Sequence, residues 1–340
     1  MVTLEEQVNT STPSKTIWPG DAFIKTIVPI LDGLILVTGL LGQTLVITIL
    51  TGRRRNKIQP PHGTDTLLLV LGAADLLLLI CLPFHTAAIT LGFWPFGSFL
   101  CKAISFLGVA CSTASVFTLA ALAVTRYLTV VHPTWVYRSR MHRHIKLSVA
   151  LLWVSALALA APQFAFRTVT MSSPVYCFAF LSDLNQVIYS TALFLFGFAL
   201  PLAIIVVMYA KIYCFIQHAR LQRNNSRYQN QVTHTSALLV LVFTFLWLPS
   251  YALMFSFIGR TITGSPGYNT IVILARLLAS SVAVVNPILY GIMSQKFRQD
   301  LLKMGRERWA WCKGCLTCCL HVRTMVQPFE LETSSEIGQN

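Results

Sequence analysis

The sequence predicts an all-α fold, a bundle of seven membrane-spanning helices, and three observations lead to this prediction. Of the 340 residues, 55% are hydrophobic and only 11% are charged, whereas a soluble domain carries about 25% charged residues. The mean hydropathy is +0.64. The apolar residues gather in seven runs, at about 26–50, 64–90, 98–132, 145–165, 187–216, 232–258 and 267–293. A membrane-crossing helix needs about 20 such residues, and these runs are far too long for barrel strands.

The basic residues between the runs predict the orientation of the helices. They cluster at 53–57, 138–146, 220–227 and 296–308, and the intervening loops hold almost none beyond Arg167 and Arg260. Basic loops stay in the cytoplasm, so we expect an extracellular N-terminus and a cytosolic C-terminus in the cell membrane. Since the net charge of +14 comes from short clusters and not from a continuous basic domain, nucleic acid is not an expected partner.

Four segments are expected along the chain. Residues 1–25 form an extracellular tail, in which Asn9 begins an Asn-Thr-Ser glycosylation sequon. Residues 26–293 form the bundle, 294–308 an amphipathic helix on the membrane surface, and 309–340 a cytosolic tail. The first twenty residues show no cleavable signal peptide, so the first membrane helix is expected to act as the insertion signal.

The third apolar run is the helix around which the others are expected to be organised. Cys101 lies near its start and Arg126 near its end, a separation of about 25 residues × 1.5 Å, or just under 40 Å. A guanidinium is costly in lipid, so Arg126 is expected in a protein cleft at the inner membrane edge. One helix would then present a cysteine to one side of the membrane and a cation to the other, as the central helix of a receptor would.

Motifs in these runs resemble those of the rhodopsin-like G-protein-coupled receptors. They are Leu71-Gly72-Ala73-Ala74-Asp75-Leu76, Trp94-Pro95-Phe96-Gly97, Trp153 and Pro162, Pro201 and Tyr209, Phe243-x-x-x-Trp247-Leu248-Pro249, and Asn286-Pro287-Ile288-Leu289-Tyr290. The resemblance covers roughly residues 26–308. Within the family, the segment 115–128 is most similar to the galanin receptors, with the kisspeptin, allatostatin and somatostatin receptors as near relatives.

This resemblance implies a cell-surface receptor that binds an extracellular peptide and signals to a heterotrimeric G protein, with arrestin as a further partner. Gly108 stands where receptors for small amines place an Asp, which favours a peptide, although Ser250-Tyr251 departs from the His pair of galanin receptors. The resemblance implies no cofactor, and the chain shows no metal triad, nucleophile elbow or phosphate loop of an enzyme. A transporter would need a polar path through the bundle, and Asp75 is the single acid expected at mid-membrane.

The ligand site is placed by the same resemblance. Its candidate residues are His85, Gln163, Phe178, Trp247, Tyr251, Met254 and Arg276. Arg276 lies at a depth similar to that of Asp32 in the first helix. Two alternatives stay open: the two residues pair and stabilise the fold, or Arg276 receives a carboxylate or carbonyl of the peptide.

Cys101 and Cys177 both lie on the expected extracellular side, where a disulfide persists and no other cysteine competes. We therefore expect a bridge between them, rather than two free thiols. It would hold the loop before the fifth helix across the mouth of the bundle.

An activation switch is also implied by the resemblance. Its residues are Asp75, Ser115, Val116, Thr125, Arg126, Tyr127, Pro201, Tyr209, Phe243, Trp247, Pro249, Asn286, Pro287 and Tyr290. Asp75 is expected to contact Ser115 and Asn286, which in relatives help to hold a sodium ion. Gln43, Val282 and Ala283 depart from the usual residues there, so sodium binding and a plain hydrogen-bonded node remain alternatives.

Thr125 is the most informative departure from the family pattern. An acid usually precedes the arginine that corresponds to Arg126, and a second partner usually lies at the position of Gln229. Since both positions are neutral here, we expect raised signalling without ligand. The alternative is an orphan or scavenging receptor that couples weakly to G proteins.

The cytosolic tail carries the cysteines Cys312, Cys315, Cys318 and Cys319. A four-cysteine zinc site needs a greater separation between its two halves. Cysteines that follow an amphipathic membrane helix are typical palmitoylation sites, and that modification is expected here.

Overall fold

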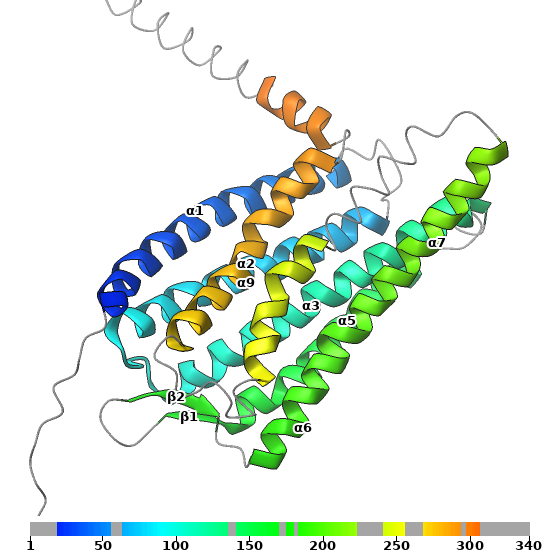
Figure 1. Cartoon of the computed structure of the whole chain (residues 1–340). Coiled ribbons are helices and arrows are strands. Elements are labelled where there is room, and N and C mark those ends of the chain that lie inside the picture. Colours follow the sequence, from blue (N-terminus) through cyan, green and yellow to red (C-terminus); the bar gives the residue numbers. More distant parts are fainter. Residues whose placement is uncertain are drawn as a thin grey trace, which may run out of the picture. The chain divides into compact units, whose positions relative to one another are not determined.

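The computed structural model describes residues 19–55, 63–134, 141–169, 175–179, 183–222, 241–255, 268–293 and 297–306. Asn9, Gln229 and the four tail cysteines lie outside these residues, so their expected roles stay predictions. Within them, six helices are long and apolar enough to cross a membrane, and Leu241–Phe255 is a shorter apolar helix. Together they make the seven crossings that the apolar runs predict, and the chain is a multi-pass membrane protein (Figure 1).

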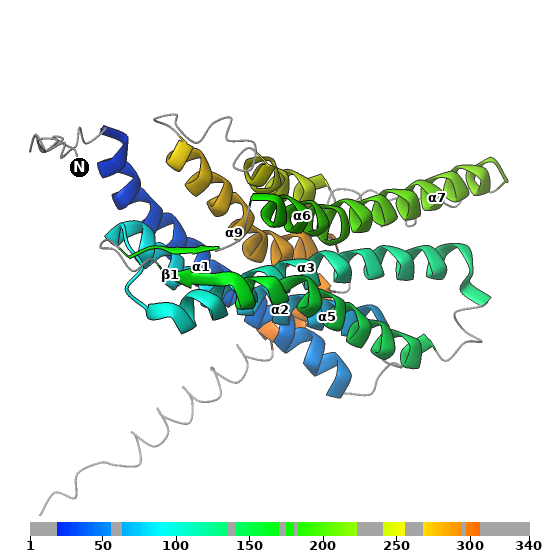
Figure 2. The same cartoon turned by 90° about the horizontal axis from the view of Figure 1, so that it is seen from below.

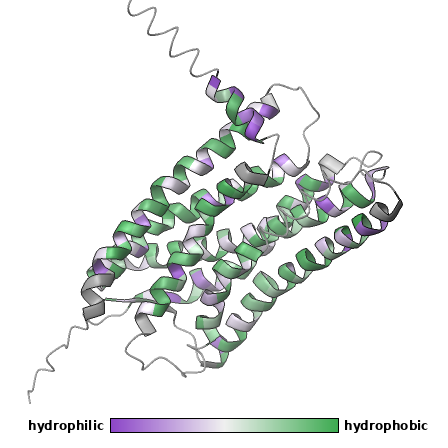
Figure 3. Cartoon of the chain, turned by 45° about the horizontal axis from the view of Figure 1, so that its top comes forward, coloured by the Kyte–Doolittle hydropathy of each residue, from purple (hydrophilic) through white to green (hydrophobic). Residues whose placement is uncertain are grey.

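The first four crossings are α1 (Pro19–Arg55), α2 (Gly63–Leu91), α3 (Gly97–Val131) and α5 (Met141–Phe166). The fifth crossing consists of α6 (Asp183–Phe194) and α7 (Leu200–Gln222), and the last is α9 (Tyr268–Met293). Hydrophobic residues cover most of their length, and hydrophilic ones gather toward the ends (Figure 3). This distribution is the one that a bilayer core requires, because each helix satisfies its own backbone hydrogen bonds and exposes apolar side chains to lipid.

Helix α3 is the centre of the bundle. It packs against α2, α5 and α7. In its most apolar stretch 67% of the residues are buried, compared with 11% in that of α5. An unbroken run of small or β-branched residues, 110–116, is buried along α3. Small side chains allow helices to approach closely in a membrane, which explains why this helix, and not a bulkier one, occupies the centre.

The fifth crossing is interrupted by a short π-helix, η1 (Leu195–Ala199), between α6 and α7. Pro201 follows it, and proline has no N–H to donate to the carbonyl one turn earlier. A π-turn is one way in which a helix accommodates such a break. Gly197 and Phe198 of η1 are buried, so the interruption faces the bundle interior.

Two strands, which the all-α prediction did not include, lie between α5 and α6. Strand β1 (Arg167–Val169) pairs antiparallel with β2 (Cys177–Ala179), with Val169 opposite Cys177. The backbone N–H of Trp94, in the turn between α2 and α3, donates to the carbonyl of Val175 at 2.7 Å. The hairpin is therefore fixed to the α2–α3 turn, where Gly92 and Gly97 adopt positive φ angles of 77° and 75°.

The residues after Met293 form a separate unit. Its described part is one helix, 297–306, within the segment 294–308 where an amphipathic surface helix is expected.

Candidate functional site

The end of the bundle that carries the hairpin, called here the disulfide end, is held together by the bond between Cys101 and Cys177. Cys101 is fully buried beside Trp94 and Ile104. The disulfide expected from the resemblance is present, and it joins β2 to the first turn of α3. The strand pair and the Trp94 cluster thus form a rigid rim, and a preformed rim lowers the ordering cost of ligand binding.

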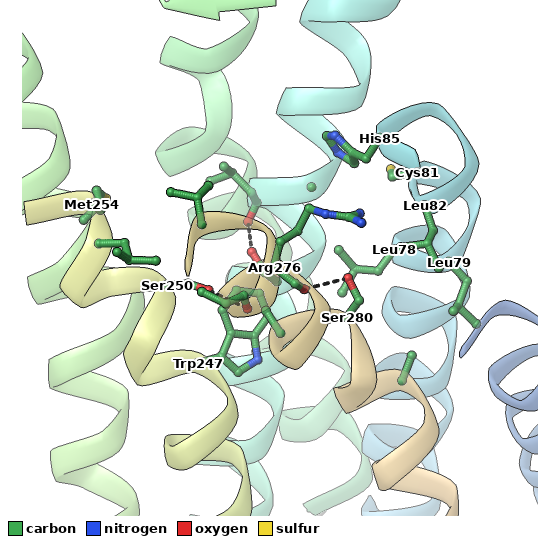
Figure 4. A pocket seen from close by; sticks show the side chains of 18 of the residues that line it. Leu78, Leu79, Cys81, Leu82, His85, Trp247, Ser250, Met254, Arg276 and Ser280 are labelled. Atoms are coloured by element: carbon green, nitrogen blue, oxygen red, sulfur yellow. Dashed lines mark hydrogen bonds between the residues drawn. The ribbon is translucent and has the colours of Figure 1, made fainter. Parts of the chain in front are cut away.

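Inside this rim lies a cavity of about 500 Å³ between α2, α3, α9 and the helix Leu241–Phe255. Its volume is within the range of small-molecule and peptide side-chain sites. Its lining is largely apolar or small, with Leu78, Gly108, Val109 and Ala279 among its residues. Of the ligand-site candidates, it brings together His85, Trp247, Met254 and Arg276 (Figure 4).

Arg276 is the charged residue of this cavity. Its Nη2 atom lies 2.5 Å from Oδ2 of Asp32, which is only 2% exposed. The hydroxyl of Thr86 donates to the same carboxylate oxygen. The three residues connect α1, α2 and α9, so the pairing of Asp32 with Arg276, one of the two alternatives, is present.

The pairing leaves part of the guanidinium unused. Within the described residues, Nε and Nη1 of Arg276 have no hydrogen-bond partner. Figure 4 shows the side chain reaching from α9 toward His85. Buried N–H groups without a partner are costly, so Arg276 both stabilises the fold and has donors left for a ligand. The two alternatives for Arg276 are therefore compatible.

The floor of the cavity is aromatic. Trp247 lines it and stacks on Phe243, with ring centroids 6.0 Å apart. Tyr251 is 6.4 Å from Trp247 and 4.6 Å from Phe198 of the π-helix. The indole Nε1 of Trp247 is buried and unpaired within the described part of the chain. These ring contacts connect Trp247, in the cavity lining, to η1 as well as to the rest of the helix Leu241–Phe255.

Asp75 forms a buried hydrogen-bond node farther into the bundle. Its Oδ2 accepts from Nδ2 of Asn286 and from Nε2 of Gln43, both at 2.8 Å, and its Oδ1 accepts from Ser115 at 3.3 Å. The Gln43 amide also donates to the carbonyl of Ala283 at 2.9 Å. Gly72 makes room for this longer side chain, because a Cβ there would lie 3.2 Å from Gln43 Oε1. The node joins α1, α2, α3 and α9.

The donors around Asp75 fit a sodium ion poorly. Three side chains already donate to its two oxygens, and the neighbouring positions on α9 are the apolar Val282 and Ala283. A sodium ion needs oxygen ligands, whereas the amide groups of Gln43 and Asn286 direct their nitrogens toward Asp75. The geometry favours the hydrogen-bonded node over the ion.

The opposite end of the bundle, called here the Arg126 end, carries the other half of the switch. The hydroxyl of Thr125 donates to the carbonyl of Ala121 at 2.7 Å, within its own helix. Among the described residues no side-chain hydrogen bond or ion pair holds Arg126. Tyr127, the next residue, lies under Lys211 of α7, whose Nζ is 5.7 Å from the ring centroid.

Comparison with known proteins decides what this arrangement is. Residues 42–290 match the model of the family described as "7 transmembrane receptor (rhodopsin family)". The chain belongs to this family. It is 32% identical over 274 residues to the galanin receptor type 1 of Rattus norvegicus, with 78% of each chain covered.

Two further relatives are similarly distant. The galanin receptor type 3 of Mus musculus is 30% identical over 280 residues, covering 80% of this chain and 76% of that one. The somatostatin receptor type 5 of Rattus norvegicus is 31% identical over 293 residues, covering 82% and 77%. The recognition of a rhodopsin-family receptor near the galanin branch is confirmed.

Within this rhodopsin-family bundle, three of the ligand-site candidates lie apart from the cavity lining. Gln163 accepts from Nε of Arg167 at 2.9 Å and donates to Tyr189 at 3.2 Å. Burial lowers the pKa of the Arg167 guanidinium below its ordinary value, and Gln163 compensates for part of its lost hydration. Tyr251 packs behind Trp247, against Phe198, and Phe178 lies in β2. A ligand contact by any of the three stays a prediction.

Several residues in or beside the cavity were not predicted from the sequence. Thr86 was not anticipated as a partner of Asp32, and Ser250, Ser280 and Gln186 line the cavity without having been candidates. Ser250 and Ser280 donate to carbonyls of Ala275 and Arg276, at 3.2 and 3.0 Å. One signal was present: serines spaced along apolar helices indicate a face that does not contact lipid.

Proposed function

We propose that this rhodopsin-family receptor lies in the cell membrane with its disulfide end extracellular, binds a peptide in the cavity beside Arg276, and signals to a heterotrimeric G protein at its Arg126 end. The relatives are receptors named for the peptides galanin and somatostatin, which supports a peptide ligand. The clustering of basic residues in alternate loops of the sequence supports this orientation.

The single observation that carries the proposal is the partly unpaired guanidinium in a largely apolar cavity. None of the described residues that line it is Asp or Glu, so a protonated amine would find no counter-ion there. Nε and Nη1 of Arg276 instead offer donors to a carboxylate or a backbone carbonyl of the peptide. Apolar side chains of the peptide would fill the rest of the cavity.

The mechanism is a population shift. The peptide favours a minor conformation to the extent that it binds that conformation more tightly. Contact above Trp247 is passed to Tyr251 and Phe198 through their ring contacts. Pro249 allows the helix Leu241–Phe255 to bend there, which opens a cleft beside Arg126 for the G protein.

Raised signalling without ligand is part of the proposal. Thr125 bonds to its own helix and gives Arg126 no ionic restraint. The competing proposal, a scavenging receptor with weak G-protein coupling, rests on the same Thr125. A direct comparison of Thr125→Asp with the wild type separates the two, as described in the Discussion.

The experiment that tests the peptide proposal is a screen of peptide ligands against cells that express the receptor, with several G-protein pathways recorded in parallel. We expect at least one peptide to raise a G-protein signal. Arg276→Gln combined with Asp32→Asn should weaken its potency, and Leu151→Ala, on the exposed face of α5, is the matched control that should not. A peptide that is internalised without any G-protein signal supports the scavenger instead.

The termini carry two further proposals. Asn9 is glycosylated if the N-terminus is extracellular, which a mobility shift on glycosidase treatment tests, with Asn9→Gln as the control. At least one of Cys312, Cys315, Cys318 and Cys319 is palmitoylated, because an acyl chain adds to the anchoring by the basic helix before it. Absence of a hydroxylamine-sensitive label on the expressed receptor would contradict this. Arrestin is proposed as a second cytosolic partner.

A further inference from the structure

A second hollow, unrelated to the ligand cavity, lies on the outside of the bundle. It has a volume of about 730 Å³ and is floored by α3, with walls from α5 and α7. We call it the α3–α5–α7 groove. Both wall helices pack on α3 yet make hardly any contact with each other in the described part of the chain. Figure 2 shows α5 and α7 diverging with α3 between them.

The groove runs along the membrane-spanning part of α5, from His144 to Leu159. Fifteen residues of helix span about 22 Å, so the groove begins at the membrane edge of the Arg126 end and passes the middle of a ~30 Å hydrocarbon core. At the far end the hydroxyl of Tyr189 donates to the carbonyl of Leu159 at 3.1 Å, which ties α5 to α6 and closes the groove. The groove is therefore long and blind, and it opens toward lipid.

The hydroxyl donors in its wall are already used within their own helices. Ser148 and Ser155 each donate to the carbonyl four residues earlier, at 2.9 Å, and Thr125 does the same at 2.7 Å. The rest of the middle section is apolar, with Leu152, Phe117 and Ile204 among its residues. A hydrocarbon chain suits such a wall, whereas a peptide backbone would lose its hydrogen bonds to water.

The mouth of the groove at the Arg126 end is basic. His144 lines it, and the exposed Lys211 of α7 lies over Tyr127, next to Leu128 in the groove floor. None of α3, α5 and α7 contains an Asp or a Glu between its bounds. Exposed Lys and Arg residues near the cytoplasmic leaflet attract anionic lipid.

From the blind apolar groove and its basic mouth, we propose that α3, α5 and α7 form a site for an anionic phospholipid of the inner leaflet. One acyl chain lies along the groove from Leu128 of α3 toward Leu159 of α5, and the headgroup lies at His144 and Lys211. The assignment of the leaflet rests on the orientation given under the proposed function. Because Thr125, Val124 and Pro201 line the groove, the bound chain contacts the residues next to Arg126 and η1.

Photolabelling tests this site without any peptide or G protein, so its outcome is independent of the receptor proposal. Purified full-length receptor is reconstituted in phosphatidylcholine vesicles that contain a trace of phosphatidylserine with a diazirine in one acyl chain. Illumination should label α3 and α5 at groove residues, and phosphatidylcholine with the same diazirine should label them much less. Labelled residues are located by mass spectrometry.

Two neighbouring variants give the matched comparison. Ala158 lines the groove, and Leu157, also exposed, does not. Ala158→Phe should remove most of the groove label, whereas Leu157→Phe should leave it unchanged. His144→Ala combined with Lys211→Ala should lower the phosphatidylserine label to the phosphatidylcholine level. Thermal unfolding of each purified variant shows that it is folded before labels are compared.

Three results would overturn the proposal. Equal labelling by the two lipids in the wild type would show that the charge at the mouth selects nothing. Persistence of the label in folded Ala158→Phe would show that the groove is not the site. Displacement of the phosphatidylserine label by excess cholesterol, with no displacement by unlabelled phosphatidylserine, would assign the groove to a sterol.

Discussion

Neutralising the Asp32–Arg276 pair should separate its effect on folding from its effect on ligand binding. In Arg276→Gln, the carboxylate of Asp32 stays 2% exposed and loses its cation. Breaking one half of a buried pair costs about 3–5 kcal/mol. We expect the lower end, about 3 kcal/mol, because Thr86 still donates to Asp32 and the Arg276 side chain is 22% exposed.

The double variant Arg276→Gln/Asp32→Asn removes both charges together. Replacing a buried pair by neutral groups is often close to neutral for stability, so most of the loss should be recovered. The assay is surface staining of an epitope-tagged receptor, with thermal unfolding of the detergent-solubilised protein as the second measurement. Both single variants should show reduced surface levels and lower unfolding temperatures, and the double variant should approach the wild type.

Ligand binding is then measured in the double variant at matched surface level. A charge-assisted hydrogen bond contributes about 1.5–3 kcal/mol, so the activating peptide should lose about 10- to 100-fold in potency. Wild-type expression of both single variants would refute the stabilising role of the pair. Wild-type potency in the double variant would refute the contact between the peptide and Arg276.

Three further predictions concern the switch, the core and the rim. Thr125→Asp should lower ligand-independent G-protein signalling, by roughly tenfold if the new pair with Arg126 contributes about 1.4 kcal/mol, and should preserve the agonist maximum; a rise from a silent baseline would favour the scavenger. Gln43→Leu removes two buried hydrogen bonds, to Asp75 and Ala283, and should lower stability by about 1–3 kcal/mol in thermal unfolding; an unchanged midpoint would contradict the role of the Gln43 amide. Cys177→Ser should reduce surface expression or peptide binding, since it frees β2 from α3, and normal binding in this variant would show that the rim does not need the disulfide.

The sequence was sufficient for the parts of the fold that depend on composition along one helix. Apolar runs identified the crossings, because the bilayer imposes a minimum length on each. Cys101 and Arg126 could be placed near opposite ends of α3 because they belong to one continuous segment. The disulfide was predictable because Cys101 and Cys177 had no competitor on their side of the membrane.

Contacts between distant helices were harder to predict, and the reason is geometric. Asp32 and Arg276 could be placed at similar depth, yet depth does not specify rotation, so Thr86 remained hidden as the third member. Gln163 has the right depth for a ligand contact, but its rotation directs it to Arg167 and Tyr189. The β1–β2 hairpin escaped because three-residue strands are too short to show an alternating pattern.

The π-helix changes how positions along the fifth crossing should be counted. Ile212 follows Leu193 by 19 residues, which in an uninterrupted α-helix would put the two about 100° apart around the axis. Both are nevertheless buried, as are Ile205 and Ile216. One extra residue in η1 restores the phase, because each residue turns the helix by about 100°. A helical wheel drawn straight through 184–218 would therefore assign the buried stripe of α7 to lipid. Cysteine pairs or fluorescent probes designed across Gly197 should be offset by one residue from such a wheel.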